Sequence, residues 1–124
     1  MIISKDLVAA SATALILSLL KEGESYGYAI IKKVKGLSGG EILWSEGMLY
    51  PVLHRLEGLE YIESFWKESG SGRKRKYYRI RADGLKALAR QKEQWELVNN
   101  TLKKAWKSIS ARYSLAGKGI LCLM

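Results

Sequence analysis

The sequence predicts a mainly α-helical α+β fold, with three short helices, a β-hairpin and one long C-terminal helix. Apolar residues recur at helical spacing in four separate segments. Two β-prone segments flank a polar, glycine-containing tip, which is typical of a hairpin. In the last third of the chain, residues at alternating spacings of three and four form a long stripe. At 124 residues and 48% apolar, the chain suits one domain with an appended element.

The first segment, 7–21, is apolar nearly all round, which predicts a helix buried on more than one side. Its apolar run is too short to span a bilayer. A signal peptide is the alternative, but Asp6 precedes the run and no small-residue cleavage site follows it. Gly23 ends this helix, and a second is predicted over 26–35 with Tyr28, Ile31 and Val34 facing inward.

The third helix is predicted from Ser45, a plausible N-cap, to about Leu59, after a β-prone segment at 41–44. Pro51 lies inside this helix, where its ring would press on the carbonyl of Gly47. Glycine can yield there, so we expect a bend and not a break. One stripe at i, i+3, i+4 and i+7 is apolar: Leu49, Val52, Leu53 and Leu56.

The opposite face of the third helix, taken at about 100° per residue, carries no carboxylate. Its members are Gly47, Tyr50, Pro51, His54 and Arg55. The hairpin follows, with strands at 61–68 and 76–81, and one of Tyr77 and Tyr78 is expected in the core because neighbours on a strand alternate faces. The order is helix, helix, short strand, helix, hairpin, which is that of a winged helix-turn-helix domain, with the third helix as reader and the hairpin as wing.

Positive charge is concentrated in the wing. The net charge is +9, and six cations lie in 73–81, which contains no acid. Nucleic acid is therefore the leading partner, and an anionic membrane surface is the next. Cys122 is the single cysteine, so neither a disulfide framework nor a CxxC site can form, which favours a reducing, cytoplasmic setting.

The long stripe predicts a heptad seam about four heptads long. Its members are Leu85, Leu88, Lys92, Trp95, Asn99, Leu102, Trp106, Ile109 and Tyr113. Polar residues at a-type positions such as Lys92 and Asn99 tend to fix register and partner number. Because the domain is too small to bury this stripe alone, we expect a second copy of the chain to cover it in a homodimer. The predicted division is residues 1–81 for the winged domain, 82–113 for the dimerisation helix and 114–124 for an unassigned tail.

Three motifs in order resemble the PadR family of bacterial transcriptional regulators. They are Ser25-Tyr26-Gly27-Tyr28-Ala29-Ile30, the segment Glu46–Glu57, and Gly72–Ile80 followed by Asp83-Gly84. The single long C-terminal helix is similar to the short-tailed branch of that family, which dimerises through this helix. The resemblance implies an operator-binding dimer, usually a repressor, that is relieved by a small aromatic or otherwise hydrophobic effector.

Two departures from the family pattern affect these expectations. Arg81 stands where the family usually has a threonine that caps the last helix. Because arginine is a poor N-cap, we expect the helix to start later, with Asp83 as cap. The apolar end Ile120–Met124 has no counterpart in the family, so no role is transferred to it.

The candidate DNA contacts lie on the third helix and on the wing. Tyr50, Pro51, His54 and Arg55 are candidates for bases and phosphates, and the alternative is an ordinary solvated helix face. Arg55 suits guanine O6 and N7. The second set, Arg73, Lys74, Arg75 and Lys76, is expected to grip phosphate or reach into the minor groove, and the alternative is again a solvated charge run.

The candidate effector site centres on Trp95, whose flat ring could stack on a planar ligand between two long helices. The alternative is a residue that fills space in the seam. Lys92, Asn99 and Trp106 are weaker candidates. The only histidine, His54, has no Cys or carboxylate cluster near it, so no metal or cofactor is implied. Cys122 is either a redox-reactive thiol or an ordinary terminal residue.

These observations favour a dimeric transcriptional repressor whose partners are a pseudo-palindromic double-stranded operator, a second copy and a small effector. A winged-helix module that binds protein, without specific DNA binding, is the alternative from another class. An amphipathic protein of the membrane surface is a third. An enzyme is the class least supported, because no catalytic constellation is present.

Overall fold

The computed structural model describes residues 1–68 and 70–116, with side chains described as far as Ser110. The chain divides into two compact units that meet between Ala89 and Arg90. The first unit therefore includes the first turns of the last helix. The unassigned tail falls partly in this helix, whereas 117–124, with Cys122, lie outside the described residues. No helix within the described residues is long and apolar enough to cross a membrane.

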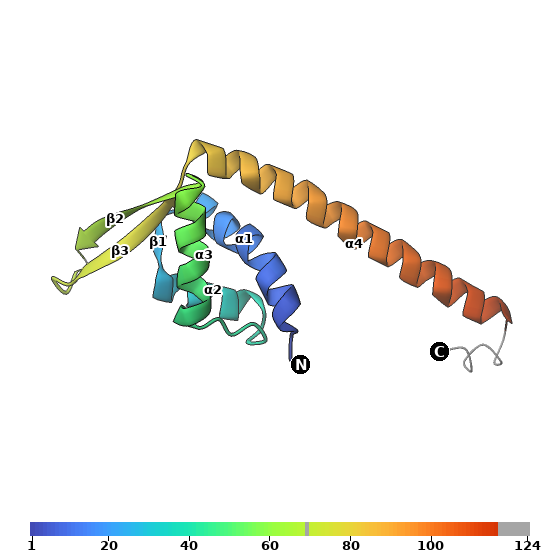
Figure 1. Ribbon diagram of the computed structural model, residues 1–124. Coiled ribbons are helices and arrows are strands. Elements are labelled where there is room, and N and C mark those ends of the chain that lie inside the picture. The colour runs from blue at the N-terminus through green and yellow to red at the C-terminus, as the bar shows by residue number, and fades with distance from the viewer. Residues whose placement is uncertain (69, 117–124) are drawn as a thin grey trace. The chain divides into compact units, whose positions relative to one another are not determined.

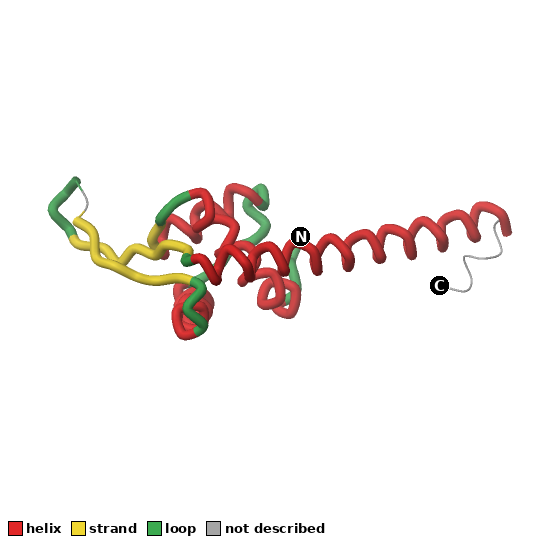
Figure 2. The backbone as a smooth tube through the Cα atoms, turned by 90° about the horizontal axis from the view of Figure 1, so that it is seen from above, coloured by secondary structure: helices red, strands yellow, loops and turns green. Residues whose placement is uncertain are grey.

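The fold is mainly helical with a small three-stranded sheet, as predicted (Figure 1). Within the described ranges, the helices are α1 (Lys5–Glu22), α2 (Gly27–Leu37), α3 (Glu46–Gly58) and α4 (Ala82–Ala116), and the strands are β1 (Ser25–Tyr26), β2 (Ile62–Glu68) and β3 (Lys74–Ile80). Figure 2 shows the strands gathered at one side of the helices of the first unit.

One apolar core joins α1, α2, α3, β2, β3 and the first turns of α4. Helix α1 contributes most to it, which confirms a buried first helix. Burying large aliphatic side chains contributes about 1.5–3 kcal/mol each relative to full exposure, so this cluster fixes the arrangement of α1, α2, α3 and the sheet. Its members are Ala12, Ile16, Leu17, Leu19, Leu20, Ile30, Val34, Trp44, Leu49, Leu53, Leu56, Ile62, Tyr78, Ala87 and Leu88.

The short strand lies elsewhere than expected. Segment 41–44 forms no strand. The backbone N–H of Ile42 instead donates to Ser38 Oγ at 2.8 Å. The actual strand is β1, which pairs antiparallel with β3 through Ser25↔Tyr78 and Tyr26↔Tyr77. The sheet order β1-β3-β2 makes the second strand of the wing the central one.

Helix α2 begins one residue later than expected, and of its three predicted inward-facing residues Val34 is buried and Ile31 packs against the core, whereas Tyr28 does not. Tyr26 belongs to β1, and Gly27, Ile30 and Val34 are the buried residues of the helix. Tyr28 was expected in the core, but its side chain is 59% exposed. Because Tyr26 is fixed in the sheet, the helix starts at Gly27 and its phase places Ile30 at the centre of the buried stripe.

Helix α3 agrees with its prediction. Ser45 is the N-cap, and its Oγ accepts from the backbone N–H of Met48 at 3.2 Å. The apolar stripe buries Leu49, Leu53 and Leu56. Pro51 lies inside the helix, which continues past it to Gly58. The proline therefore does not break the helix.

Helix α4 begins at Ala82, so the expectation that Asp83 caps it is wrong. The carbonyl of Arg81 accepts a hydrogen bond from the backbone N–H of Leu85 at 3.0 Å, at the N-terminal end of the helix. The backbone N–H of Arg81 donates to the carbonyl of Tyr61 at 2.8 Å, which ties this point to the start of the wing. Tertiary contacts thus set the helix start despite a poor capping residue.

Candidate nucleic-acid interface

The exposed face of α3 splits between two sides of the first unit. Tyr50, Pro51 and His54 are exposed, as a reader helix requires. Tyr50 lines a cleft toward the wing. Arg55 faces the other way, because its Nη2 donates to Thr13 Oγ1 of α1 at 2.9 Å. A base contact by Arg55 would therefore have to replace this hydrogen bond.

The cleft between α2, α3 and the wing has a volume of about 470 Å³. It brings Tyr50 together with the four cations predicted for the wing, although these residues are far apart in the sequence. Its lining comprises Tyr26, Gly27, Tyr28, Glu46, Tyr50, Trp66, Arg73, Lys74, Arg75 and Lys76. A hollow of this charge, next to the first turn of α3, suits a phosphate backbone and the base edges beside it.

A glycine sets the close approach of α2 and α3 at the floor of this cleft. A Cβ placed at Gly27 would lie 2.6 Å from the hydroxyl oxygen of Tyr50 and 3.6 Å from Cδ2 of Leu49. Any larger residue would push the Tyr50 ring away from α2. The motif around Gly27 thus positions a candidate DNA contact, which is a packing reason for glycine at this place.

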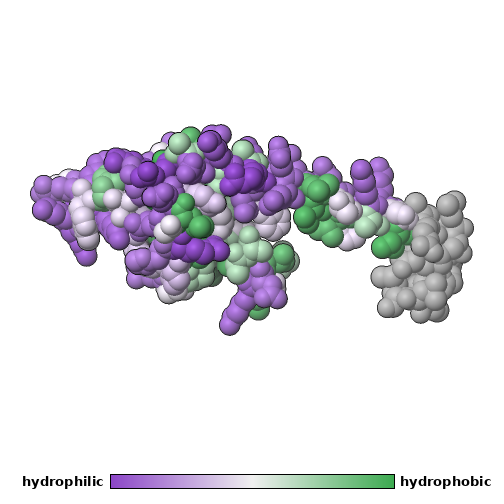
Figure 3. All heavy atoms as spheres, turned by 45° about the horizontal axis from the view of Figure 1, so that its top comes forward, coloured by the Kyte–Doolittle hydropathy of each residue, from purple (hydrophilic) through white to green (hydrophobic). Residues whose placement is uncertain are grey.

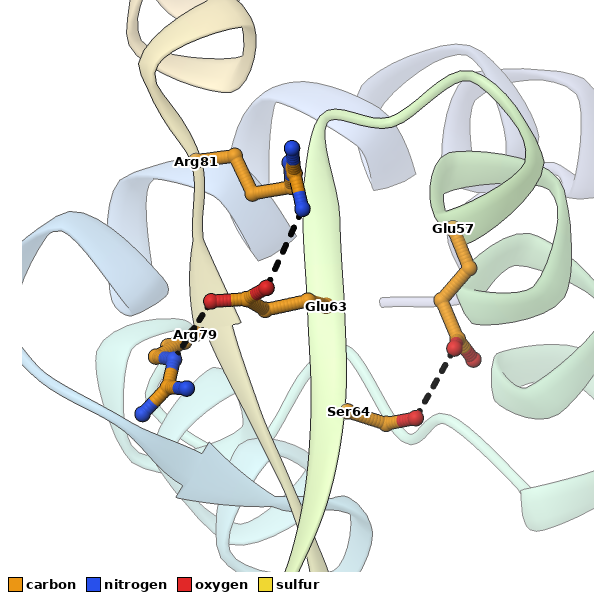
Figure 4. A network of polar contacts seen from close by, with 5 residues as sticks. All are labelled: Glu57, Glu63, Ser64, Arg79 and Arg81. Atoms are coloured by element: carbon orange, nitrogen blue, oxygen red, sulfur yellow. Dashed lines mark hydrogen bonds and ion pairs between the residues drawn. The ribbon is translucent and has the colours of Figure 1, made fainter.

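Cations at the base of the wing are already neutralised. Glu63 accepts from Arg79 Nε at 2.6 Å and from Arg81 Nη1 at 3.1 Å, as Figure 4 shows. The hydrogen bond from Arg79 is the main reason that the pKa of Glu63 lies below its ordinary value, and the nearby charges of Arg79 and Arg81 also lower it. Arg79 and Arg81 therefore add less to the positive electrostatic potential around the wing tip than the number of cations in 73–81 implies.

The outer face of the sheet is a layer of aromatic rings covered by cations. The Tyr26 and Tyr77 rings meet edge to face at 5.1 Å, and Phe65 stacks on Tyr77 at 5.9 Å. The guanidinium of Arg75 lies 4.7 Å from the centre of the Tyr26 ring. Such cation–π contacts contribute about 0.5–1 kcal/mol at exposed sites. They hold the stem of Arg75 in place near the cleft.

Lys67 completes the support of the wing from the side of α1. Its Nζ donates to Glu24 Oε1 at 2.6 Å and lies 5.1 Å from the centre of the Tyr77 ring. The hydrogen bond to Glu24 raises the pKa of Lys67 above its ordinary value, and the charge of Glu24 adds to this effect. Lys67 therefore forms an ion pair with a carboxylate that lies outside the hairpin.

Tyr78 is the tyrosine of the wing that lies in the core, as the alternation of the strand predicted. Burial, aided by Glu57 and Tyr50, raises its pKa from 10.0 to about 12. The folded state favours the neutral phenol, so folding stability should fall as the pH rises from about 10 toward 12.

Titration of the phenols tests this expectation. Tyr78 should keep its proton to about pH 12, and ultraviolet absorbance of phenolate measures the loss of that proton. Tyr78→Phe should remove this late step. A late step that survives in Tyr78→Phe would assign it to another tyrosine.

Five residues of the cleft lining were not predicted as contacts from the sequence: Tyr26, Gly27, Tyr28, Glu46 and Trp66. Trp66 is 68% exposed although aromatic residues of strands are usually covered, and Tyr28 was assigned to the core. Glu46 lines the cleft together with Tyr50, so the exposed surface of α3 is not free of carboxylates. The alternation along β2, which pairs Trp66 with Lys76, was the signal available for Trp66.

The exposed apolar residues of α4 lie mostly on one stripe beyond Ala89. Trp95 is half-buried, whereas Leu102, Trp106 and Ile109 are exposed. Figure 3 shows hydrophobic patches along this helix among polar ones. Leu88 is an exception among the seam residues, because it is 3% exposed and packs in the core of the first unit. Leu85 is exposed, and the side chain of Tyr113 lies outside the described part of the chain.

A shallow hollow of about 310 Å³ lies on α4 around Trp95. Its lining comprises Trp95, Glu96, Val98, Asn99 and Leu102. The helix thus brings together Trp95 and Asn99 of the predicted effector site, one turn apart. Lys92 is exposed but does not line this hollow.

No group of three or more His, Cys, Asp or Glu side chains that could hold a metal ion occurs within residues 1–68 and 70–116. His54 is exposed on α3. The residues of the cleft offer hydrogen bonds, positive charge and aromatic surface to a ligand.

Comparison with known proteins places this geometry in a family. A transcriptional regulator of Clostridium thermocellum, Cth-833, is similar in structure, with a TM-score of 0.76 and 37% identity over 83% of this chain and 97% of that one. A PadR-like transcriptional regulator of Bacillus cereus, BC4206, gives a TM-score of 0.73 and 31% identity over 82% and 97%. An uncharacterized protein of Lysinibacillus sphaericus, protein X, is 31% identical over 100 residues, which cover 81% of this chain and 92% of that one.

The family model of the PadR-like transcriptional regulators matches residues 16–90. This range contains α2, α3, the whole sheet and the cleft between them. The resemblance noted in the sequence is therefore confirmed, as is the class of DNA-binding regulator over that of enzyme. The chain belongs to the PadR-like family of transcriptional regulators.

Proposed function

We propose that the chain is a homodimeric repressor that binds a pseudo-palindromic operator through α3 and the tip of the wing. The observation that carries this proposal is the cleft in which Tyr50 of α3 meets Arg73, Lys74, Arg75 and Lys76. In winged helix-turn-helix proteins the reader helix enters the major groove, and the positions of the cations suit the flanking backbone. Such a regulator would act on the nucleoid in the cytoplasm.

The exposed stripe of α4 supports the dimer. Trp106 is 60% exposed, and Leu102 and Ile109 are also exposed, although large apolar side chains at this spacing usually meet a partner helix. Burial of the stripe against a second copy would hold two reader helices at a fixed separation. Two-fold symmetry then predicts half-sites about one helical turn, roughly 10 bp, apart.

The effector site is proposed at the hollow around Trp95 and Asn99, with Lys92 outside it. A small aromatic molecule that stacks on Trp95 in the dimer would shift the spacing of the reader helices and so release the operator. Competition between such a molecule and the operator, followed by tryptophan fluorescence and DNA anisotropy, tests this step. Simultaneous binding of both without loss of affinity would contradict it.

Selection of bound DNA from a random pool tests the function as a whole. The expected result is a pseudo-palindrome, and mapping it onto the source genome would locate the regulated promoter. The alternative is a winged-helix module that binds protein without specific DNA binding. No enriched sequence, together with weak salt dependence of DNA binding, would favour this alternative.

A double substitution at the wing tip tests the contacts to phosphate. Arg73→Ala/Arg75→Ala should weaken binding to all sequences alike, and the slope of log K against log salt should become shallower by about 0.9 for each phosphate that the variant no longer neutralises. Titrations at several salt concentrations measure both effects. Arg79→Gln/Arg81→Gln removes the same charge where Glu63 already neutralises it, so it should have the smaller effect. Equal effects of the two pairs would mean that only net charge matters.

A further inference from the structure

One carboxylate stands in the cation-rich cleft. Glu46 is the first residue of α3, its side chain is exposed, and it lines the cleft together with Tyr50 and Arg73–Lys76. A negative charge at this place opposes an approaching phosphate backbone. Its presence within the surface proposed to meet DNA therefore needs a reason.

Three acids that pack against the sheet of the wing, Glu24, Glu57 and Glu63, are held by partners, whereas Glu68 at the end of β2 forms no ion pair within the described residues but lies outside the cleft lining. Glu24 pairs with Lys67 at 2.6 Å, and Glu63 pairs with Arg79 at 2.6 Å. Glu57 accepts from Ser64 at 2.8 Å and lies 3.9 Å from Lys76 (Figure 4 shows the first of these contacts). Glu46, by contrast, forms no ion pair with any residue in the described part of the chain, although four cations line the same cleft. Its carboxylate is left available to a ligand.

Its place on the helix suits contact with a base edge. The N-terminal residues of a reader helix are those that reach into the major groove. Glu46 also benefits from the helix dipole, which stabilises an acid in the first turn. That benefit explains why a glutamate is tolerated there, but a position outside the cleft would provide it without repelling phosphate.

The base edges decide what this carboxylate can accept. Cytosine presents the N4 amine, a donor, in the major groove. Guanine presents the acceptors N7 and O6, and thymine presents O4, so both would repel a carboxylate. Adenine presents a donor beside the N7 acceptor, which makes it a poorer partner than cytosine. An unpaired carboxylate thus discriminates through repulsion as well as attraction.

We propose that Glu46 is a specificity-determining residue that accepts a hydrogen bond from N4 of one cytosine in each half-site of the operator. This inference rests on the proposed operator binding and deepens it, because it names one base that α3 reads. Glu46 rejects guanine and thymine at that position and lowers affinity for DNA that lacks the cytosine. The four cations around it supply the attraction that offsets its charge.

Random-pool selection with the wild-type protein and three variants tests the proposal. The wild type should enrich cytosine at one position of each half-site, with a discrimination of about fivefold to a hundredfold over guanine. Glu46→Ala should lose the preference at that position alone and bind unrelated DNA more tightly. Glu46→Gln, which pairs with N6 and N7 of adenine, should shift the preference to adenine. Glu46→Asp keeps the charge at the helix start but shortens the side chain by one carbon–carbon bond, about 1.5 Å, so it should lose most of the discrimination.

Glu68→Ala is the matched control, because it removes the same charge at the end of β2, outside the cleft lining. It should strengthen binding to all DNA slightly and leave the sequence preference unchanged. Thermal unfolding of each variant distinguishes a loss of folding stability from a loss of base discrimination. A wild-type motif that persists unchanged in Glu46→Ala, or discrimination kept in Glu46→Asp, would overturn the role of Glu46 alone. No motif with the wild type would overturn the operator binding on which it rests.

Discussion

Replacing Leu102 and Trp106 together by glutamate is expected to weaken binding to a complete operator by about 100-fold or more. The two side chains belong to the exposed stripe of α4, and the added carboxylates of both copies would have to be buried in the proposed dimer seam. Without the dimer, each winged unit binds its half-site independently and the gain from linked binding, about 10²–10⁴, is lost. Sedimentation gives the oligomeric state, and DNA anisotropy gives the affinity.

Leu97→Glu provides the control for that substitution. Leu97 is 67% exposed on α4 and lies two residues from Trp95, about 200° around the helix, so it points away from the stripe. A glutamate there should leave both the dimer and operator binding intact. A monomer from Leu97→Glu, or a dimer that survives Leu102→Glu/Trp106→Glu, would place the interface on another surface.

Gly84→Ala is expected to destabilise the winged unit by about 1–3 kcal/mol or more. A Cβ at this position would overlap the carbonyl oxygen of Tyr61 and lie 2.8 Å from Cγ1 of Ile80. The carbonyl of Tyr61 also accepts from the backbone N–H of Arg81 at 2.8 Å, so it cannot move without loss of that bond. Denaturant unfolding of the variant measures the change in the free energy of unfolding.

Gly36→Ala should raise the free energy of unfolding, whereas Gly84→Ala lowers it. Gly36 lies in α2 with nothing within 4 Å of an added Cβ, and alanine favours a helix by up to about 1 kcal/mol over glycine. The pair distinguishes a glycine needed for close approach from one that is not. Equal stability of Gly84→Ala and the wild type would mean that the start of α4 shifts at little cost.

Much of the fold was predictable because it depends on local physics. The Ser45 cap, the stripe of Leu49, Leu53 and Leu56 and the two strands of the wing follow from side-chain spacing and capping alone. The cleft was half predictable. The cations and Tyr50 could be named from the sequence, because residue type and helix phase identify them.

The remaining features depend on contacts between distant segments. Strand β1 has only two residues and exists because β3, some fifty residues later, supplies its partner groups. Arg55 is directed by Thr13, and Glu46 becomes part of the cleft only when the wing folds beside α3. No local pattern records such pairings. This is why the exposure of Tyr28, the direction of Arg55 and the start of α4 differed from what the sequence predicted.

The pairing of β1 with β3 has a consequence for how this protein can be recombined. The wing is continuous in sequence, yet its central strand takes one neighbour from the segment just before α2. A hairpin transplanted from a relative without its own Ser25-Tyr26 partner would meet a foreign strand, and the Tyr26–Tyr77 and Arg75–Tyr26 pairs would no longer form. The exchangeable module is therefore 25–80, with helix, reader and wing inherited together, and only the tip is free to diversify by itself.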